Sequence, residues 1–394
     1  MRLVGTTVRG IRTPIIKEND DLASIVVDSV INASKSEGFN FKDKDIIAIT
    51  EAVVGISEGN YVTVDNIVSD LNAKFPSKKI GIVYPILSRN RFSMILKAIA
   101  RAMDKVTILL SFPSDEVGNG IMDENLLSAS PFNLGSLISE EDYEKYFGTF
   151  IHPFTGINMV DYYRDLVKSE NCDVEFVFSN NPSDILKYTN NVLTCDIHSR
   201  FKTKKMLSKQ GAFVLSLSDI LNESVGGSGF NPDYGLLGSN KSTDERLKLF
   251  PKDGASLVLK IKDEMFKRTG KNFEVMVYGD GAFKDPVGGI WELADPVVSP
   301  FYTEGLKGTP NEIKLKYVSD NMFADLRGDE LKDAIKEEIK KKDNDLKGQN
   351  VSLGTTPRRI TDLVGSLCDL TSGSGDKGTP VVLVQGYFDN LADE

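Results

Sequence analysis

Short apolar runs rich in valine and isoleucine recur along this chain and alternate with segments of helical character. Such runs are typical of buried strands. They occur at residues 6–11, 45–50, 80–84, 106–110, 173–178, 191–195, 273–278 and 381–386. Helices are predicted between them, at residues 22–27, 92–103, 255–269, 330–342 and 361–370. Strands that alternate with helices form sheets that the helices cover. The sequence therefore predicts a mixed α/β, or α+β, fold.

The 394 residues are too many for one ordinary hydrophobic core. We expect three parts. Residues 1–119 and 246–394 have regular strand and helix patterns and would form the two halves of one core. Residues 120–245 are dense in loop signals but contain further α/β elements. This middle part is predicted to be an inserted subdomain.

Composition excludes several classes of function. The net charge of −10 argues against a nucleic-acid surface, but it leaves room for a local basic pocket that binds a phosphorylated small molecule. Three distant cysteines and two histidines make neither a disulfide framework nor a multi-histidine metal site. No signal peptide or membrane-spanning stretch is present in the sequence, so we expect a cytoplasmic protein that binds neither membrane nor nucleic acid.

Two polar clusters follow predicted strands. Asp115, Glu116 and Asn119 come shortly after the strand at 106–110, and Asp280 and Gly281 follow the strand at 273–278. If these strand ends meet, Asp115 and Asp280 would hold a hard divalent cation, because Mg²⁺ uses one or two carboxylates and completes its shell with water and phosphate oxygens. The alternatives are a helix cap or solvated turn at 115–116 and an Asp-Gly hairpin turn at 280–281.

A second candidate for anion binding is the turn before the helix at 92–103. It contains Arg89 and Arg91, and the start of a helix favours negative charge. Arginines on the surface beside a helix are the alternative. The glycine-rich turn at 226–229 lacks the Lys-Ser/Thr ending of a P-loop and is not one.

Several segments together resemble one family, the γ-glutamyl ligase of the deazaflavin coenzyme factor-420. They are the N-terminal turn at 12–18, the strand and Glu-Gly turn at 46–59, the cluster at 115–119, the Leu-Pro-type helix region at 249–270, the strand and turn at 277–286 and the C-terminal strand at 380–386. The resemblance implies a γ-glutamyl ligase-like fold with the middle segment inserted. It also implies an NTP-dependent, usually GTP-dependent, enzyme that adds L-glutamate to a carboxylate acceptor.

The resemblance also assigns residues to roles. Asp115, Asp280 and the main chain of Gly281 would bind Mg²⁺ or Mn²⁺. Glu116, Arg89 and Lys284 are the candidate catalytic residues. The nucleotide, GTP or ATP, would contact Thr13, Pro14, Ile15, Ile16 and Asn119. Family members are similar in pairing as dimers, so a homodimer is expected.

The chain departs from the family pattern at several positions. Glu51 and Ala52 stand where a Ser-Lys pair is frequent, Ile56 replaces a lysine that contacts the nucleotide, and Gly281 replaces a metal-binding threonine. The arginine that ends the second motif is absent, and Lys284 would stand in as a point charge.

The first metal motif has a second possible position, at residues 238–243. This segment lies closer to the Leu-Pro-type helix, but it has Asn240 in place of the metal aspartate and Lys241 in place of the glutamate. The distance from the Glu-Gly turn favours Asp115.

Three hypotheses about function follow. The first is the amino-acid ligase, whose acceptor is the deazaflavin precursor, a folate-like molecule or another carboxylate. The second is a non-catalytic relative that binds a nucleotide or metabolite. The third is a metallohydrolase that uses the same two carboxylates.

Overall fold

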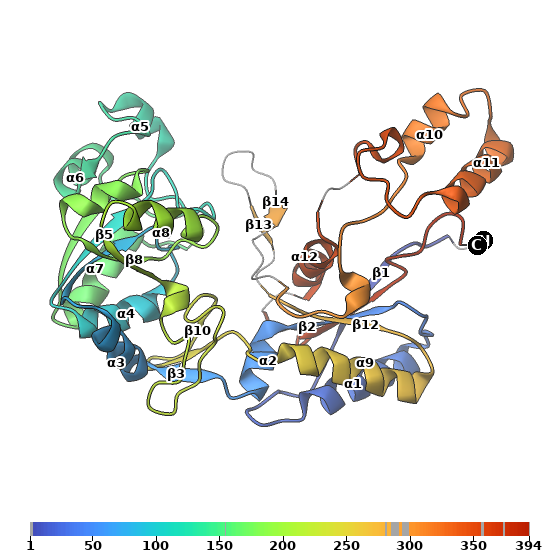
Figure 1. Ribbon diagram of the computed structural model, residues 1–394, viewed down its shortest axis with the longest axis horizontal. Coiled ribbons are helices and arrows are strands. Elements are labelled where there is room, and N and C mark those ends of the chain that lie inside the picture. Colours follow the sequence, from blue (N-terminus) through green and yellow to red (C-terminus); the bar gives the residue numbers. More distant parts are fainter. Residues whose placement is uncertain are drawn as a thin grey trace.

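The structure is a computed structural model that describes residues 3–153, 155–279, 282–284, 291–293, 299–355, 358–372 and 375–393. For 282–284 and 291–293 it describes the backbone. The chain forms two lobes joined by a narrow waist, with helices and strands in both (Figure 1). The predicted mixed α+β fold class is confirmed.

The first lobe, called the core lobe here, contains a four-stranded sheet with the order β1–β15–β2–β12. Its strands are β1 (Thr7–Ile11), β2 (Ile46–Thr50), β12 (Glu274–Tyr278) and β15 (Val381–Gln385). β12 runs parallel to β2, whereas β15 runs antiparallel to β1 and β2. The C-terminal ends of β2 and β12 and the start of β15 therefore lie at one edge of the sheet.

Helices cover both faces of this sheet. Successive side chains of a strand point to opposite faces. Accordingly, Ile47 and Ile49 of β2 pack with α1 (Leu22–Glu37) and α9 (Gly254–Thr269), while Ile46 and Ala48 pack with α12 (Ile360–Ser372). Burial on both faces explains why every residue of 46–49 is apolar. Two of these helices end in typical caps: Asp21 accepts a hydrogen bond from the backbone N of Ser24, and Gly270 ends α9 with a φ of 68°.

The second lobe, called the inserted lobe, holds a six-stranded sheet with the order β6–β7–β5–β4–β8–β9. Its strands are β4 (Lys79–Val83), β5 (Lys105–Leu110), β6 (Ile138–Ser139), β7 (Asp173–Phe178), β8 (Asn191–Thr194) and β9 (Phe213–Ser216). All pairs are parallel except β6 with β7.

This sheet is doubly wound. The chain moves from β4 outward to β5 and β7, then returns to the other side of β4 for β8 and β9. One face packs against α3 (Val64–Lys74), α4 (Phe92–Ala102) and α7 (Met159–Ser169), and the other against η1 (Pro182–Lys187) and α8 (Arg200–Ser208). Parallel strands covered on both faces need long apolar runs, which the sequence has.

A small three-stranded sheet forms the waist between the lobes (Figure 1). Its order is β10 (Asn240–Thr243), β11 (Arg246–Lys248) and β3 (Tyr61–Thr63). Beside it, the buried side chain of Asn60 donates hydrogen bonds to the carbonyls of Phe230 and Phe250, at 3.0 and 2.7 Å. The outgoing and returning chains are thus fastened together where they leave the core lobe.

The division of the chain differs from the predicted boundaries at 119 and 245. β4 and β5 were expected in the first half of the core, yet they pair with β7 and β8 of the inserted lobe. The inserted lobe therefore spans about residues 60–250. Apolar runs show that a strand is buried but do not say which strands lie beside it, so the sequence could not separate the two sheets.

The remaining elements lie around these sheets. They are α2 (Glu51–Ser57), α5 (Glu124–Ala129), α6 (Glu140–Phe147), η2 (Leu217–Asp219), β13 (Ala282–Lys284), β14 (Trp291–Leu293), η4 (Glu304–Leu306), α10 (Leu315–Asn321), α11 (Gly328–Lys341) and η5 (Asn350–Ser352). α10 and α11 form a separate helical layer beyond α12 in Figure 1. Within the described ranges no helix has both the length and the apolar character to cross a bilayer. The three cysteines are buried and unbridged.

Candidate active site

The edge of the core-lobe sheet where the parallel strands end forms one wall of a cleft. Thr50 at the end of β2 is paired in register with Tyr278 at the end of β12. Thr50 also donates its backbone N–H to the carbonyl of Pro380, at 2.9 Å, which brings in the start of β15. Ligands of α/β proteins bind beyond the carboxyl ends of parallel strands. The topology therefore makes this edge the candidate binding site.

Gly279 allows a close approach within this wall. A Cβ atom added to Gly279 would lie 2.4 Å from Cγ of Glu51. Glu51 is the first residue of α2, where a carboxylate is favoured by the helix dipole. A glycine directly after β12 therefore lets the Glu51 side chain pass beside the strand end.

The opposite wall comes from the inserted lobe and the waist. Arg91 and Asn90 precede α4, and Asn240, Lys241 and Lys248 belong to β10 and β11. The backbone N–H of Lys241 donates to the carbonyl of Asn90 at 2.6 Å, which joins the two parts of this wall.

The resulting cleft has a volume of about 520 Å³. This size suits a small-molecule ligand. Its described lining carries three cationic side chains, Arg91, Lys241 and Lys248, and two carboxylates, Glu51 and Asp369. The balance is one positive charge, although the whole chain has a net charge of −10. The cleft is therefore a locally cationic site in an acidic protein, as an anionic ligand requires.

The central charges of the cleft are an ion pair between Lys248 and Glu51. The exposed fractions of the two side chains are 7% and 5%. α2 and β11 approach closely here: a Cβ on Gly55 would lie 2.8 Å from the carbonyl oxygen of Leu249. Directly after β2 this chain has Glu51 and Ala52, where the family frequently has a Ser-Lys pair. Lys248, from a different strand, places an ammonium group at this position.

Asp115 lies elsewhere, beyond β5 in the inserted lobe, and does not line this cleft. Its Oδ1 accepts hydrogen bonds from the backbone N of Val117 and Asn119, and its Oδ2 accepts from the backbone N of Leu87 and from Nδ2 of Asn119. Four donors occupy the four lone-pair positions of the carboxylate. Burial raises the pKa of Asp115, and these hydrogen bonds oppose the rise. The arrangement organises a loop and offers no free oxygen to a metal.

Glu116 and Asn119 also form hydrogen bonds that hold loops of the inserted lobe. The Glu116 carboxylate accepts hydrogen bonds from the backbone N of Ile197, His198 and Ser199 and from the Ser199 hydroxyl. It fixes the turn before α8. Asn119 donates twice to Asp115, as described above. Neither residue lines the cleft.

The predicted nucleotide-binding turn lies behind the cleft wall. Thr13 donates its backbone N–H to the carbonyl of Gly378, a lining residue, at 3.3 Å. Pro14 borders a different groove, together with Arg9 and Arg12, while Ile15 is exposed and Ile16 is buried.

The remaining predicted site residues are close in the sequence to residues that line the cleft. Arg89 is exposed and precedes two lining residues. Asp280 and Gly281 lie outside the described residues, directly after Gly279. Lys284 is the last residue of β13, and its side chain lies outside what is described.

The cleft is therefore lined by residues that were the less favoured candidates in the sequence. The segment at 238–243, considered above as the second position of the first metal motif, lines the cleft through Asn240, Lys241 and Ser242. Lys248 was not identified. The sequence feature that could have identified Lys248 is its position just before the Leu-Pro-type helix region. Over the described residues no group of three or more His, Cys, Asp and Glu side chains is placed to hold a metal ion.

The structure is that of a two-lobed α+β protein with a cationic cleft at its waist. The chain belongs to the F420-0:gamma-glutamyl ligase family, whose profile matches residues 10–386. The resemblance proposed from the sequence is thereby confirmed, and the protein is a ligase of the γ-glutamyl ligase type. No match was found among curated proteins.

Proposed function

We propose that this protein uses a nucleoside triphosphate, GTP or ATP, to join the carboxylate of a small acceptor to the amino group of an amino acid, with L-glutamate as that amino acid. The observation that carries the proposal is the cationic cleft formed by Arg91, Lys241 and Lys248 in a protein of strongly negative net charge. Family membership supplies the ligase type.

The three cations suit the chemistry of an acyl phosphate route. An oxygen of the acceptor carboxylate forms a bond to the γ-phosphorus, and the bond from that phosphorus to the β–γ bridging oxygen breaks. The amine nitrogen then attacks the carbonyl carbon, inorganic phosphate leaves and the nitrogen releases a proton. Both steps place negative charge on phosphate oxygens, which fixed ammonium and guanidinium groups stabilise.

Within the inferred site, Lys248 would contact phosphate while Glu51 holds its ammonium group in the cleft. Lys241 is more exposed: its side-chain exposed fraction is 40%, and its ion-pair partner is Asp244 at 2.6 Å. An exposed partner is easily exchanged for a phosphate, because a surface ion pair contributes little energy.

The described residues by themselves do not fit a magnesium site. The Glu51 carboxylate is engaged by Lys248, Asp369 is the only other described lining carboxylate, and Asn240 offers a neutral amide. Asp115 has no free oxygen. Asp280 directly follows the lining residue Gly279 and remains the predicted metal ligand. A bound divalent ion would neutralise phosphate charge.

A second candidate function is a relative that binds the nucleotide without catalysis. The observation that favours it is the pair Asn240 and Lys241, an amide and an ammonium group in the cleft where the second alignment of the first metal motif expects two carboxylates.

Calorimetric titration with GTP or ATP, with and without Mn²⁺, followed by a glutamate ligation assay on a panel of carboxylates, tests both candidates. We expect nucleotide binding and amide product from the first function, and binding without product from the second. Neither binding nor product would contradict both.

A matched pair of variants locates the site. Lys241→Met removes a cleft ammonium and should weaken nucleotide binding by roughly 10- to 100-fold, as expected for a charge-assisted hydrogen bond. Lys267→Met removes a comparable surface pair, with Glu264 at 2.8 Å, and should leave binding unchanged because it lies on α9 outside the cleft.

A further inference from the structure

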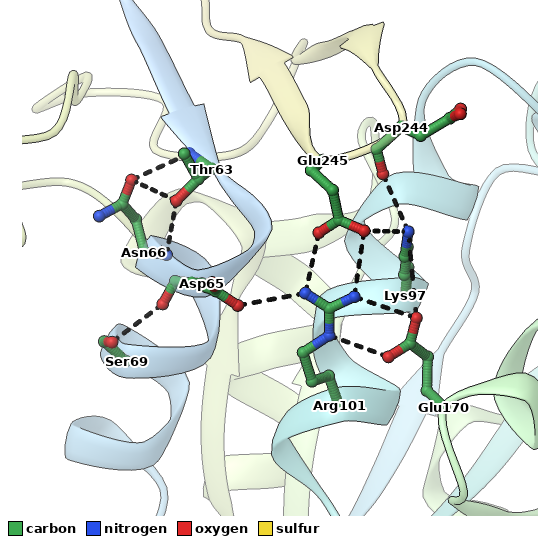
Figure 2. A network of polar contacts seen from close by, with 9 residues as sticks. All are labelled: Thr63, Asp65, Asn66, Ser69, Lys97, Arg101, Glu170, Asp244 and Glu245. Atoms are coloured by element: carbon green, nitrogen blue, oxygen red, sulfur yellow. Dashed lines mark hydrogen bonds and ion pairs between the residues drawn. The ribbon is translucent and has the colours of Figure 1, made fainter.

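The hairpin formed by β10 and β11, residues 240–248, presents two of the three cleft cations, Lys241 and Lys248. Its turn, with Asp244 and Glu245, lies beside Lys97 and Arg101 of α4 (Figure 2). Among the described strands, β10 is at the edge of the waist sheet and pairs with β11 alone. An edge hairpin of this kind needs contacts beyond its own ladder to stay in one position.

Arg101 of α4 supplies such contacts. A guanidinium group has five N–H donors. Two pair with Glu170, two pair with Glu245 and one pairs with Asp65, at distances of 2.8 to 3.2 Å (Figure 2). All five donors are therefore used, and Glu170 and Glu245 are each held by a two-bond fork. Bidentate geometry of this kind fixes orientation as well as distance.

Lys97, one turn earlier on α4, binds the same hairpin turn. Its Nζ pairs with Oε1 of Glu245 at 2.5 Å and donates to the carbonyl of Asp244 at 2.9 Å. The side-chain exposed fractions are 17% for Lys97 and 30% for Arg101, so both cations are partly shielded from water. Together they lower the pKa of Glu245 to about 2, so this carboxylate and its ion pairs persist into acidic solution.

The same helix also contacts the other end of the hairpin. Arg91 and Asn90 stand at the start of α4, and the carbonyl of Asn90 accepts the backbone N–H of Lys241. α4 therefore holds the hairpin at its turn through Arg101 and Lys97, and the segment just before α4 holds its first strand through Asn90. The cleft residues before α4 and those of the hairpin are thus linked through contacts at both ends of the hairpin.

We propose that Arg101 is a positioning residue that sets the place of the 240–248 hairpin, and through it the spacing of Lys241 and Lys248 from Arg91. The proposal rests on the proposed function, because it assigns these cations to one anionic ligand. Arg101 itself lies outside the cleft and acts through Glu245.

Arg164 offers a matched control in the same lobe. It also pairs with three carboxylates, Glu140, Glu144 and Asp161, and its side chain is 18% exposed. It joins α6 to α7 and has no contact with the hairpin among these partners. Arg101→Met and Arg164→Met therefore remove similar ion networks, one attached to the hairpin and one not.

The first measurement needs no ligand. Hydrogen exchange of the full-length variants should show exchange in peptides covering 240–248 about tenfold faster in Arg101→Met than in the wild type, with no change there in Arg164→Met. Unchanged exchange of these peptides in folded Arg101→Met would overturn the proposal, whether or not the protein binds a nucleotide. Failure of the proposed function is seen separately, as absence of GTP and ATP binding by the wild type.

The second measurement connects the hairpin to the ligand. We expect Arg101→Met to weaken GTP binding by roughly 3- to 10-fold, with Arg164→Met at the wild-type value. Arg101→Lys keeps the charge but not the two forks, so it should restore the melting temperature more fully than the binding. Equal losses of binding in Arg101→Met and Arg164→Met would assign Arg101 to general stability and overturn the positioning role.

Discussion

Lys248 and Glu51 lie 197 positions apart in the chain, yet they form an ion pair buried at the waist between the two lobes. Glu51 begins α2 of the core lobe, and Lys248 ends β11 on the returning chain. The pair thus joins the chain that leaves the core lobe to the chain that comes back. It also holds an ammonium group at the edge where β2 and β12 end.

Loss of Lys248 should lower both the stability of the fold and the affinity for the nucleotide, and the two effects can be measured separately. Lys248→Met removes the ammonium group of a buried ion pair, and removing one member of such a pair costs about 3 to 5 kcal/mol. The double variant Glu51→Gln, Lys248→Met removes both charges, so it should regain most of the free energy of unfolding. Urea unfolding of the full chain measures this difference.

Nucleotide titration of the same two variants separates support of the fold from ligand binding. The double variant should bind GTP as weakly as Lys248→Met, because the missing ammonium group is not restored. If the double variant bound GTP like the wild type, Lys248 would be a purely structural residue.

Replacement of Asp115 should affect the stability of the inserted lobe. Asp115→Asn exchanges one acceptor oxygen for an NH₂ group, so two of the four donors around it lose their partner. Each unsatisfied buried donor costs about 1 to 3 kcal/mol, so for two donors we expect a total of about 2 to 6 kcal/mol in urea unfolding.

Asp123→Asn is the matched control for this change. Asp123 also accepts two hydrogen bonds from one asparagine, Asn125, but it does so at an exposed helix cap. Its replacement should therefore cost no more than about 1 kcal/mol. An Asp115→Asn protein that kept its stability but lost Mn²⁺ binding would instead support the metal-ligand role inferred from the sequence.

The elements of the fold were largely readable from the sequence, whereas their partners were not. The apolar runs at 45–50, 106–110 and 173–178 became β2, β5 and β7 with shifts of at most one residue. Local periodicity contains that information. Pairing depends on contacts between distant segments, so β2 and β5 gave the same signal although they belong to different sheets.

The site was harder to predict for the same reason. Asp115 and Lys248 both stand beside apolar strand sequence, but only the three-dimensional arrangement shows that one is enclosed by four backbone and amide donors and the other faces a cleft. A local signal did exist in the segment at 238–243, which precedes the Leu-Pro-type region. The distance counted from the Glu-Gly turn favoured Asp115 over this segment, because the sequence does not show that a separate lobe lies between the turn and residues 238–243.

Stability should depend on pH through Asp196, which is 2% exposed. Burial raises the pKa of Asp196, hydrogen bonds from Thr203 and Ser199 oppose the rise, and the nearby Glu116 carboxylate adds to it. A raised folded-state pKa means that the contribution of Asp196 to stability is complete below about pH 4 and is lost as pH rises through the folded-state value. The stability of Asp196→Asn relative to the wild type should therefore increase from pH 4 upward and then level off.

Thermal melting of both proteins between pH 3 and 8 measures this difference. Glu264→Gln is the opposing control, because Lys267 lowers the pKa of the exposed Glu264. Its small contribution is present above the ordinary carboxyl range and is lost as pH falls. A pH-independent difference between wild type and Asp196→Asn would contradict the assignment of a raised pKa to Asp196.

The metal chemistry of the cleft should respond to one change at Asn240, the residue that stands in for the metal aspartate in the second alignment. Asn240 lines the cleft together with Gly279, the residue before Asp280. Asn240→Asp adds a hard anionic oxygen ligand, so we expect binding of Mn²⁺, titrated without nucleotide, to become roughly tenfold tighter. Asn90→Asp adds the same charge on the inserted-lobe wall and serves as the control, because it is not at the motif position. Equal Mn²⁺ affinities of the two variants would show that charge alone matters and would remove residues 238–243 from the metal site.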